Sequence, residues 1–208
     1  IKNLFIASSK KIMNKKNKTE KYIQGSLLET LSLLKKISDS AKYISRIMEA
    51  SNLIIDSINS NHCIYVAGNG GSAAHSQHFA AELVSRFNLD RNPLPSIALT
   101  TDSSILTAIA NDYGYEKLFE RQLEGLSKPG DVFIGLTTSG KSKNIIRAFK
   151  KAKSMDLLTI SICGASGIKD FKPDVEISIP SLKTPLIQEM HGISIHLICD
   201  LVEKSIFI

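Results

Sequence analysis

Residues 64–86 constrain the fold more than any other stretch of the chain. They begin with a short apolar run, residues 64–67, which predicts a buried strand and stops at a turn of sequence GNGGS. A helical pattern follows at once. Glycines allow the backbone to approach a ligand closely, and the N-terminus of the following helix favours an anion. A strand, a glycine turn and a helix in this order predict a ligand site at the carboxyl edge of a parallel sheet.

Apolar runs and helix-like segments alternate through the rest of the chain. Strands are expected at residues 63–67, 96–99, 132–136, 158–163 and 175–179. The expected helices between and after them are residues 73–87, 103–110, 117–126, 143–155 and 186–205. The last helix is apolar on most of its surface and should be buried. This alternation predicts an α/β fold with a parallel sheet and helices on both faces.

Two amphipathic helices are expected before the first strand, at about residues 20–38 and 41–60. Their apolar faces exceed what a lone helical hairpin could hide, so they should pack on the domain or on a second subunit. Residues 1–18 are expected to be a poorly ordered extension. Residues 19–208 then form a single domain that includes both helices.

The composition excludes several classes of partner. The net charge of +6 is concentrated in N-terminal lysines without the interleaved aromatic residues of a nucleic-acid site, so no nucleic acid is expected. A modest positive charge does suit an anionic substrate. No apolar run reaches the ~18 residues that cross a membrane. Cys63, Cys163 and Cys199 lie in apolar runs without metal-type spacing, as buried thiols of a cytoplasmic protein do.

A second polar loop, TTSGKS at residues 137–142, follows the third expected strand. Its hydroxyls, its glycine and the helix after it predict a phosphate site. The alternative is an ordinary capping turn, because Ser142 or Ser139 would cap that helix in any case. The loop lacks P-loop spacing, GNGGS lacks GxGxxG spacing, and no acidic residue ends the second strand. A dinucleotide is therefore not expected.

His78 and Glu82 lie four residues apart and share one face of the expected helix. Such pairs are often only solvated, but polar residues also interrupt the apolar C-terminal helix. They are Gln188, Glu189, His191 and His196. Imidazole, carboxylate and amide groups together could hold zinc, or a glutamate and a histidine could act as base and acid. Eight residues of helix rise ~12 Å, so Gln188 and His196 meet one metal only if Gln188 precedes the first regular turn or another subunit contributes.

Five motifs occur in order: GNGGSAAHSQHFAAELVSR, ALTTDSS, ANDYG, TTSGKS and TPLIQEMHGISIH. With them, residues 40–205 resemble the phosphoheptose isomerases, which have a sugar-isomerase (SIS) fold. The resemblance implies a flavodoxin-like SIS domain with a five-stranded parallel sheet, and a cytoplasmic homotetramer with active sites between subunits. It implies an aldose–ketose isomerase that converts D-sedoheptulose 7-phosphate to D-glycero-D-manno-heptose 7-phosphate through an enediol. This is the first step toward ADP- or GDP-heptose for lipopolysaccharide or capsule.

Carried over by position, the resemblance implies that Glu82 and His196 are catalytic. A zinc ion seen in some relatives would be held by His78, Glu82, Gln188 and His196. The phosphate would be held by Ser72, Thr137, Ser139 and Ser142, with Thr138 beside them. The sugar would be contacted or ordered by Asn69, Arg86 and Asp112, and approached by Gly70, Gly71 and Gln188. The phosphorylated seven-carbon sugar and further copies of the chain are the implied partners.

Two positions depart from the resemblance. Many relatives carry Asp where this chain has His75, and some have Asp near Pro185. The alternative function is a non-catalytic SIS protein that binds phosphosugars or associates with a replication initiator. A pure binding protein has no need to keep Glu82, Gln188 and His196 together, and all three are present.

Overall fold

The computed structural model describes residues 2–208, with side chains from residue 17 onward. Five parallel strands form one sheet in the order β2-β1-β3-β4-β5. The strands are β1 (Ile64–Gly68), β2 (Ser96–Ala98), β3 (Val132–Thr137), β4 (Leu158–Gly164) and β5 (Val175–Ile179). Val66 of β1 lies between Ala98 of β2 and Ile134 of β3. The predicted α/β class and parallel sheet are confirmed.

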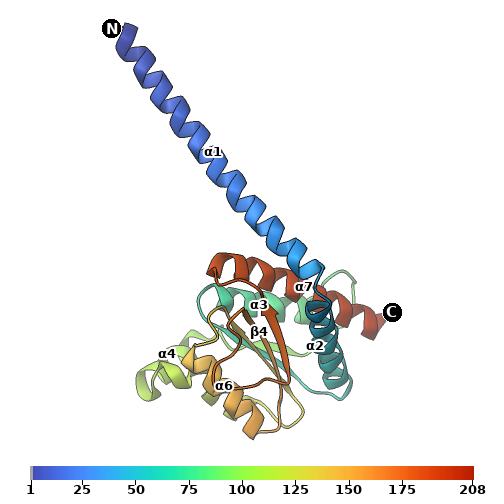
Figure 1. Cartoon of the computed structure of the whole chain (residues 1–208). Coiled ribbons are helices and arrows are strands. Elements are labelled where there is room, and N and C mark those ends of the chain that lie inside the picture. Colours follow the sequence, from blue (N-terminus) through green and yellow to red (C-terminus); the bar gives the residue numbers. More distant parts are fainter. Residues whose placement is uncertain (1) are drawn as a thin grey trace.

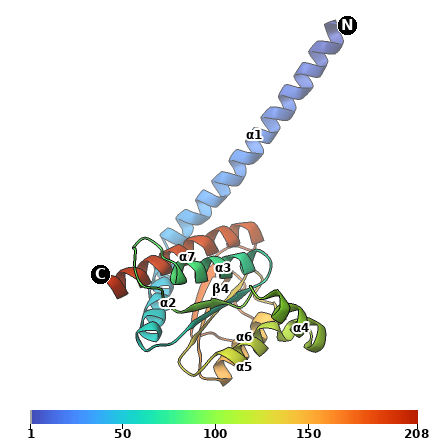
Figure 2. The ribbon, with the colours of Figure 1, turned by 180° about the vertical axis from the view of Figure 1, so that it is seen from behind.

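Helices cover both faces of this sheet (Figures 1 and 2). One layer contains α2 (Ala41–Asn59), α3 (Gly71–Val84) and α7 (Thr184–Phe207). The other contains α5 (Leu118–Leu126) and α6 (Lys143–Ser154), with α4 (Ser103–Tyr113) and the short 3-10 helix η1 (Tyr115–Lys117) beside them. The first layer carries the residues expected to be catalytic or to bind metal, which are His78, Glu82, Gln188 and His196.

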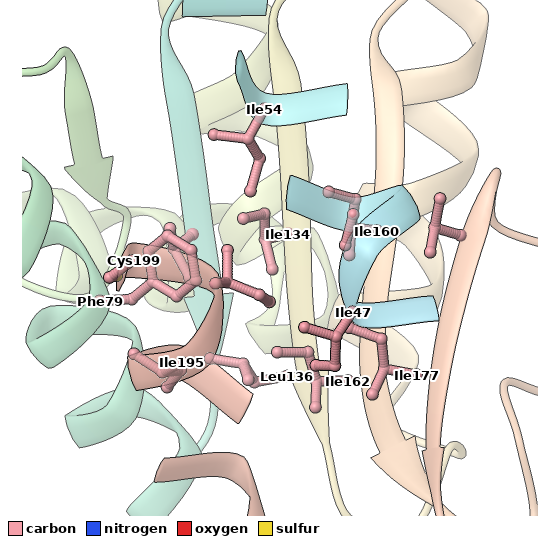
Figure 3. Close-up of a cluster of buried hydrophobic side chains, with 14 of the residues drawn as sticks. Ile47, Ile54, Phe79, Ile134, Leu136, Ile160, Ile162, Ile177, Ile195 and Cys199 are labelled. Atoms are coloured by element: carbon pink, nitrogen blue, oxygen red, sulfur yellow. The ribbon is translucent and has the colours of Figure 1, made fainter. Parts of the chain in front are cut away.

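The larger core lies between the sheet and the layer of α2, α3 and α7. Figure 3 shows Ile54 of α2, Phe79 of α3 and Ile195 of α7 among the inward-facing strand residues Ile134 and Ile160. All five side chains are fully buried. Burying an isoleucine or a phenylalanine stabilises a fold by about 1.5–3 kcal/mol, so this face holds α3 and α7 firmly in place.

Several element boundaries differ from the prediction. Helix α3 spans Gly71–Val84, whereas residues 73–87 were expected. The helix ends early because Arg91 donates to the carbonyl oxygens of Glu82 and Leu83, which would otherwise continue the helical ladder. Helix α7 begins at Thr184, with a proline in its first turn, rather than at residue 186.

Helix α1 (Lys2–Ser38) is longer than expected and projects away from the domain (Figure 1). Leu33 and Ile37 are buried at its base, but Leu27, Leu28 and Leu31 are 66%, 63% and 59% exposed. The stripe of leucines therefore does not pack on its own domain. The interpretation of residues 1–18 as an extension separate from a domain at 19–208 stays a prediction.

Helix α7 was expected to be buried on most of its surface. Its inner face is buried, but Leu197 and Leu201 are 43% and 38% exposed. These two leucines, like Leu27, Leu28 and Leu31 of α1, are among the apolar side chains that the described part of one chain leaves exposed. None of the helices within residues 2–208 has an apolar stretch sufficient to traverse a lipid bilayer.

Candidate active site

Helices α3 and α7 lie side by side (Figure 2), and the order of their contacts shows that they run in the same direction. Three contacts fix their register. The backbone of Gly71 meets Gln188, His75 meets Gly192, and His78 meets His196. A Cβ atom at Gly71 would come within 3 Å of the side-chain amide of Gln188, so that amide packs directly on the backbone of the glycine turn. Side chains from the two helices therefore face one another along a common line.

At the middle of this line His78, Glu82 and His196 form one cluster. The two imidazole Nε2 atoms lie 2.9 Å apart, and Nε2 of His78 lies 3.1 Å from Oε1 of Glu82. One ligand atom from each of the three residues falls within 4.8 Å of the others. The side chains of His78 and Glu82 are 46% and 22% exposed, so the cluster is open to solvent or to a ligand.

The donor set of this cluster fits a zinc ion. Two imidazole nitrogens and one carboxylate oxygen are the ligands of catalytic zinc, which keeps a further position open. Gln188 does not join them within one chain. It lies inside the regular helix α7, against Gly71, and eight residues before His196. Gln188 does not precede the first turn, so its predicted metal role requires a second subunit and stays a prediction.

A polar cavity of about 320 Å³ opens where the glycine turn meets the TTSGKS loop. It is lined by Asn69, Gly70, Gly71, Ser72, Leu136, Thr137, Thr138, Ser142, Thr184 and Gln188. Eight of these residues were expected at the substrate site, and the structure brings them together. Leu136 and Thr184 were not expected. Leu136 is an ordinary strand residue in the sequence, whereas Thr184 could have been found from its place in the TPLIQEMH motif.

The TTSGKS loop does not behave as a simple helix cap. Ser142 is the N-cap residue of α6, yet its side chain caps no backbone N–H. Its hydroxyl instead lies 3.3 Å from the hydroxyl of Thr137. Gly140 has a φ of +66°, and a Cβ there would collide with the carbonyl of Gly167. The loop thus brings two hydroxyls together, and its Ser142 side chain occupies none of the N–H groups at the start of α6, where an anion is favoured.

Three expected residues lie outside this cavity. Ser139 is exposed, and its hydroxyl accepts the N–H of Lys141 at 3.2 Å. Asp112 is exposed at the end of α4 and accepts from Asn111. Arg86 is exposed in the loop after α3. Their predicted roles in substrate binding stay predictions.

A second cavity of about 480 Å³ adjoins the first and shares Asn69 and Ser142 with it. Its other walls come from the end of α4, from η1 and from the start of α6, and include Tyr115 and Asn144. Both side chains bond the amide of Asn69. The sequence did not single out either residue. The signals available were the tyrosine next to the ANDYG motif and the asparagine two residues after TTSGKS.

His75 and His191 lie on the same line of α3 and α7, between Gln188 and His196. Their ring centroids are 6.1 Å apart. His191 is fully buried, and neither of its nitrogens has a partner among the described residues. Burial, together with the neighbouring His75, lowers the pKa of His191 to about 3. Burial also lowers the pKa of His75, with smaller effects from His78 and His196. Both imidazoles are neutral near pH 7.

Known proteins are similar to this chain in sequence. The SIS domain model matches residues 29–164. A phosphoheptose isomerase of Sulfurimonas denitrificans is 47% identical over 189 residues, which cover 90% of this chain and 97% of that protein. One from Clostridium acetobutylicum is 44% identical over 187 residues, covering 89% of this chain and 95% of that protein.

Solved structures agree. A phosphoheptose isomerase from Neisseria gonorrhoeae has a TM-score of 0.81 and 34% identity, covering 89% of this chain and 98% of the other. One from Francisella tularensis has a TM-score of 0.85 and 29% identity, with the same coverage of both chains.

Proposed function

The chain belongs to the phosphoheptose isomerases, which contain an SIS domain, and from this membership we propose that it interconverts D-sedoheptulose 7-phosphate and D-glycero-D-manno-heptose 7-phosphate. The observation that carries the proposal is one line of side chains along α3 and α7. A hydroxyl-lined cavity lies at one end of that line, and an acid–base cluster lies further along it. A phosphorylated ketose needs both: an anchor for its phosphate and a base near its carbonyl carbon.

The residues of the cluster suit the proton transfers of this reaction. An aldose and a ketose interconvert when a proton moves between C1 and C2 through a cis-enediol. Glu82 is the base that takes this proton, and His196 is the acid that exchanges a proton with the sugar oxygens. Positioned groups of this kind contribute about 10²–10⁴-fold each to a rate. The distant phosphate loop supplies binding energy that orients the reacting carbons.

Zinc is part of the proposal. His78, Glu82 and His196 would hold it, with Gln188 of a second subunit as the predicted fourth ligand. When bound, zinc would act as a Lewis acid toward the sugar oxygens.

The zinc proposal is tested by titrating metal-free protein with zinc and a competing chelator. The His78→Ala and His196→Ala variants should each bind zinc at least 10–100-fold more weakly, because each removes a ligand from a three-residue set. His62→Gln is the matched control, since His62 lies beside Asp131 and outside the cluster. Equal zinc affinity in the wild type and in all three variants would contradict a zinc site at this cluster.

We propose further that the protein is a homotetramer and that it acts in the cytoplasm. The exposed leucines of α1 and α7 support a homotetramer, and Leu197 lies directly beside His196, so a second subunit would complete the cluster. Cys63, Cys163 and Cys199 are free, which supports a cytoplasmic setting. The product would enter the synthesis of ADP- or GDP-heptose for lipopolysaccharide or capsule.

The direct test of function is to incubate the purified protein with sedoheptulose 7-phosphate and follow the sugar by NMR, with and without added zinc. Appearance of the aldose signals is expected. Absence of turnover in both conditions would contradict the proposal and favour a protein that only binds phosphosugars.

A further inference from the structure

We propose that Tyr115 and Asn144 are positioning residues that hold the side-chain amide of Asn69 in one orientation, so that it presents a single N–H donor to the ligand. The proposal deepens the proposed function, and the identity of the ligand rests on that function. The ligand group at this point is then an oxygen that accepts a hydrogen bond. The carbonyl oxygen of an open-chain sugar phosphate is such a group.

The two asparagine amides form a reciprocal pair. Nδ2 of Asn69 donates to Oδ1 of Asn144 at 2.9 Å, and Nδ2 of Asn144 donates to Oδ1 of Asn69 at 2.8 Å. The hydroxyl of Tyr115 donates to the same Oδ1 of Asn69, also at 2.8 Å. Asn144 is 3% exposed, so its half of the pair is rigidly packed.

A backbone group sets the polarity of this whole network. The N–H of Ile145 can only donate, and it donates to Oδ1 of Asn144 at 2.9 Å. Asn144 must therefore turn its oxygen toward that N–H and use its NH₂ group to donate to Asn69. It follows that Asn69 turns its own oxygen to Asn144 and to Tyr115. The orientation of Asn69 is thus fixed by the first turn of α6.

Counting the hydrogen bonds of Asn69 shows what remains for a ligand. Its Oδ1 has two lone pairs, and two donors occupy them. Its Nδ2 has two hydrogens, of which one goes to Asn144. The second hydrogen has no acceptor among the described residues. Asn69 lines both the cavity of the TTSGKS loop and the adjoining cavity, so this N–H is available to a molecule that occupies them.

The first test compares Tyr115→Phe with its matched control, Tyr113→Phe. Both tyrosines are exposed and line the same cavity, but no described residue bonds the hydroxyl of Tyr113. Loss of one of the two donors to Oδ1 of Asn69 should loosen the amide and raise KM for sedoheptulose 7-phosphate about fivefold, with kcat within about twofold of wild type. Tyr113→Phe should keep the wild-type KM, and both variants should melt at the wild-type temperature.

The second variant, Asn144→Asp, keeps an acceptor for the N–H of Ile145 but replaces the donor that faces Oδ1 of Asn69 with an oxygen. It should raise KM further, by roughly 10–100-fold, because two oxygens then oppose each other. If Tyr115→Phe has the same KM as Tyr113→Phe while the wild-type protein is active, the positioning role is wrong and the proposed function stands.

An NMR measurement that does not depend on turnover tests the positioning role separately from the isomerase function. In a ¹⁵N spectrum of the full chain, the side-chain amide protons of Asn69 should lie away from the free-asparagine positions and should shift when inorganic phosphate or the sugar phosphate is added. In Tyr115→Phe and Asn144→Asp they should move toward the free positions. Unchanged signals in both variants would overturn the inference even if the wild-type protein fails to isomerise the sugar.

Discussion

The carboxylate of Glu82 is the residue on which the proposed chemistry most depends. Replacing it with glutamine keeps its shape but removes the base. We expect Glu82→Gln to lower kcat at least 10²-fold, because that is the usual contribution of a positioned base. Binding of the sugar phosphate, measured by calorimetry, should survive, since the TTSGKS cavity is untouched.

Glu124→Gln is the matched control for this change. Glu124 lies on α5, on the other face of the sheet, where it pairs with Lys151 at 2.6 Å. It should retain wild-type kcat. Activity near wild type in Glu82→Gln would remove Glu82 from the mechanism.

The buried imidazole of His191 makes stability depend on pH. Its pKa is about 3 in the folded protein and near 6.5 when unfolded, so the unfolded chain binds more protons in the window between these values. The free energy of unfolding is therefore unaffected by the titration of His191 well above pH 6.5 and decreases as pH falls from 6.5 toward 3. Between pH 7.5 and 5.5 the loss from this one residue should be about 1 kcal/mol.

Urea unfolding of the wild type and of His191→Gln at both pH values measures this contribution. The variant should lose less stability than the wild type between pH 7.5 and 5.5. An identical loss in the two proteins would mean that His191 does not titrate as its burial requires.

The sequence predicted many residues of the candidate site, but it could not show which of them line the same cavity. The hydroxyls of Ser72, Thr137 and Ser142 were expected together and lie together. Ser139 belongs to the same loop but is exposed and bonds Lys141 instead. Between Ser139 and Ser142 the backbone makes a left-handed turn at Gly140, which the residue types alone do not specify. A motif gives residue types and spacing but not the direction of a side chain.

Among the elements, the loop after α3 depends on one carboxylate of α7. Glu203 is 1% exposed and accepts the backbone N–H groups of Phe87, Asn88 and Leu89. It also accepts from Nε of Arg91 at 3.0 Å. Arg91 in turn caps α3 through the carbonyls of Glu82 and Leu83. The end of the helix that carries Glu82 is therefore held by a buried ion pair.

We expect Glu203→Gln to destabilise the fold by about 3–5 kcal/mol, because it leaves a buried guanidinium without its counter-charge. Chemical unfolding followed by circular dichroism measures the change. Asp200→Asn is the control, since Asp200 pairs with Lys204 near the surface and should change stability by less than about 1 kcal/mol. A loss below 1 kcal/mol in Glu203→Gln would show that the loop is held by other contacts.

This ion pair also explains why the end of α3 was predicted wrongly. The helical pattern of the sequence continues to residue 87, but Arg91, which caps the helix, is held by Glu203 of α7, more than 100 positions away. Strand β5, by contrast, was predicted at its observed bounds, since its alternating burial is a local property. The local pattern therefore sufficed for β5, whereas the end of α3 depends on a tertiary contact.

For the whole molecule, the uncovered leucines predict self-association. Burying a leucine contributes about 1.5–3 kcal/mol, so the exposed stripe on α1 could stabilise an assembly substantially. Light scattering after size-exclusion chromatography should give four times the chain mass for the wild type. The double variant Leu27→Lys, Leu31→Lys should dissociate to smaller species, because it places charges in the interface.

Leu126→Lys is the matched control for this experiment, since Leu126 is 51% exposed but lies on α5, on the other side of the sheet. It should keep the wild-type mass. A monomeric wild-type protein at micromolar concentration would contradict the proposed tetramer.

The fold as a whole was predictable because strand–helix alternation leaves few topologies for a parallel sheet. The projection of α1 was not. Its leucine stripe indicated that the helix must pack on something, but a single sequence does not say whether the partner surface is its own domain or another chain. The same ambiguity applied to Gln188. Its spacing from His196 allowed a metal ligand either before the first turn of α7 or from another subunit, and the start of α7 at Thr184 excludes the first arrangement.

The register of α3 and α7 has a further consequence for the size of the substrate. Ser72 and His78 are six residues apart on α3, which places them ~9 Å apart along the helix axis. A molecule that touches the hydroxyl loop and the acid–base cluster together must span that length. We therefore expect a sugar phosphate too short to span this distance to reach the hydroxyl loop or the cluster, but not both. The spacing of the two sites along α3 would then select substrates by length, without any side chain that contacts the additional carbons of a longer sugar.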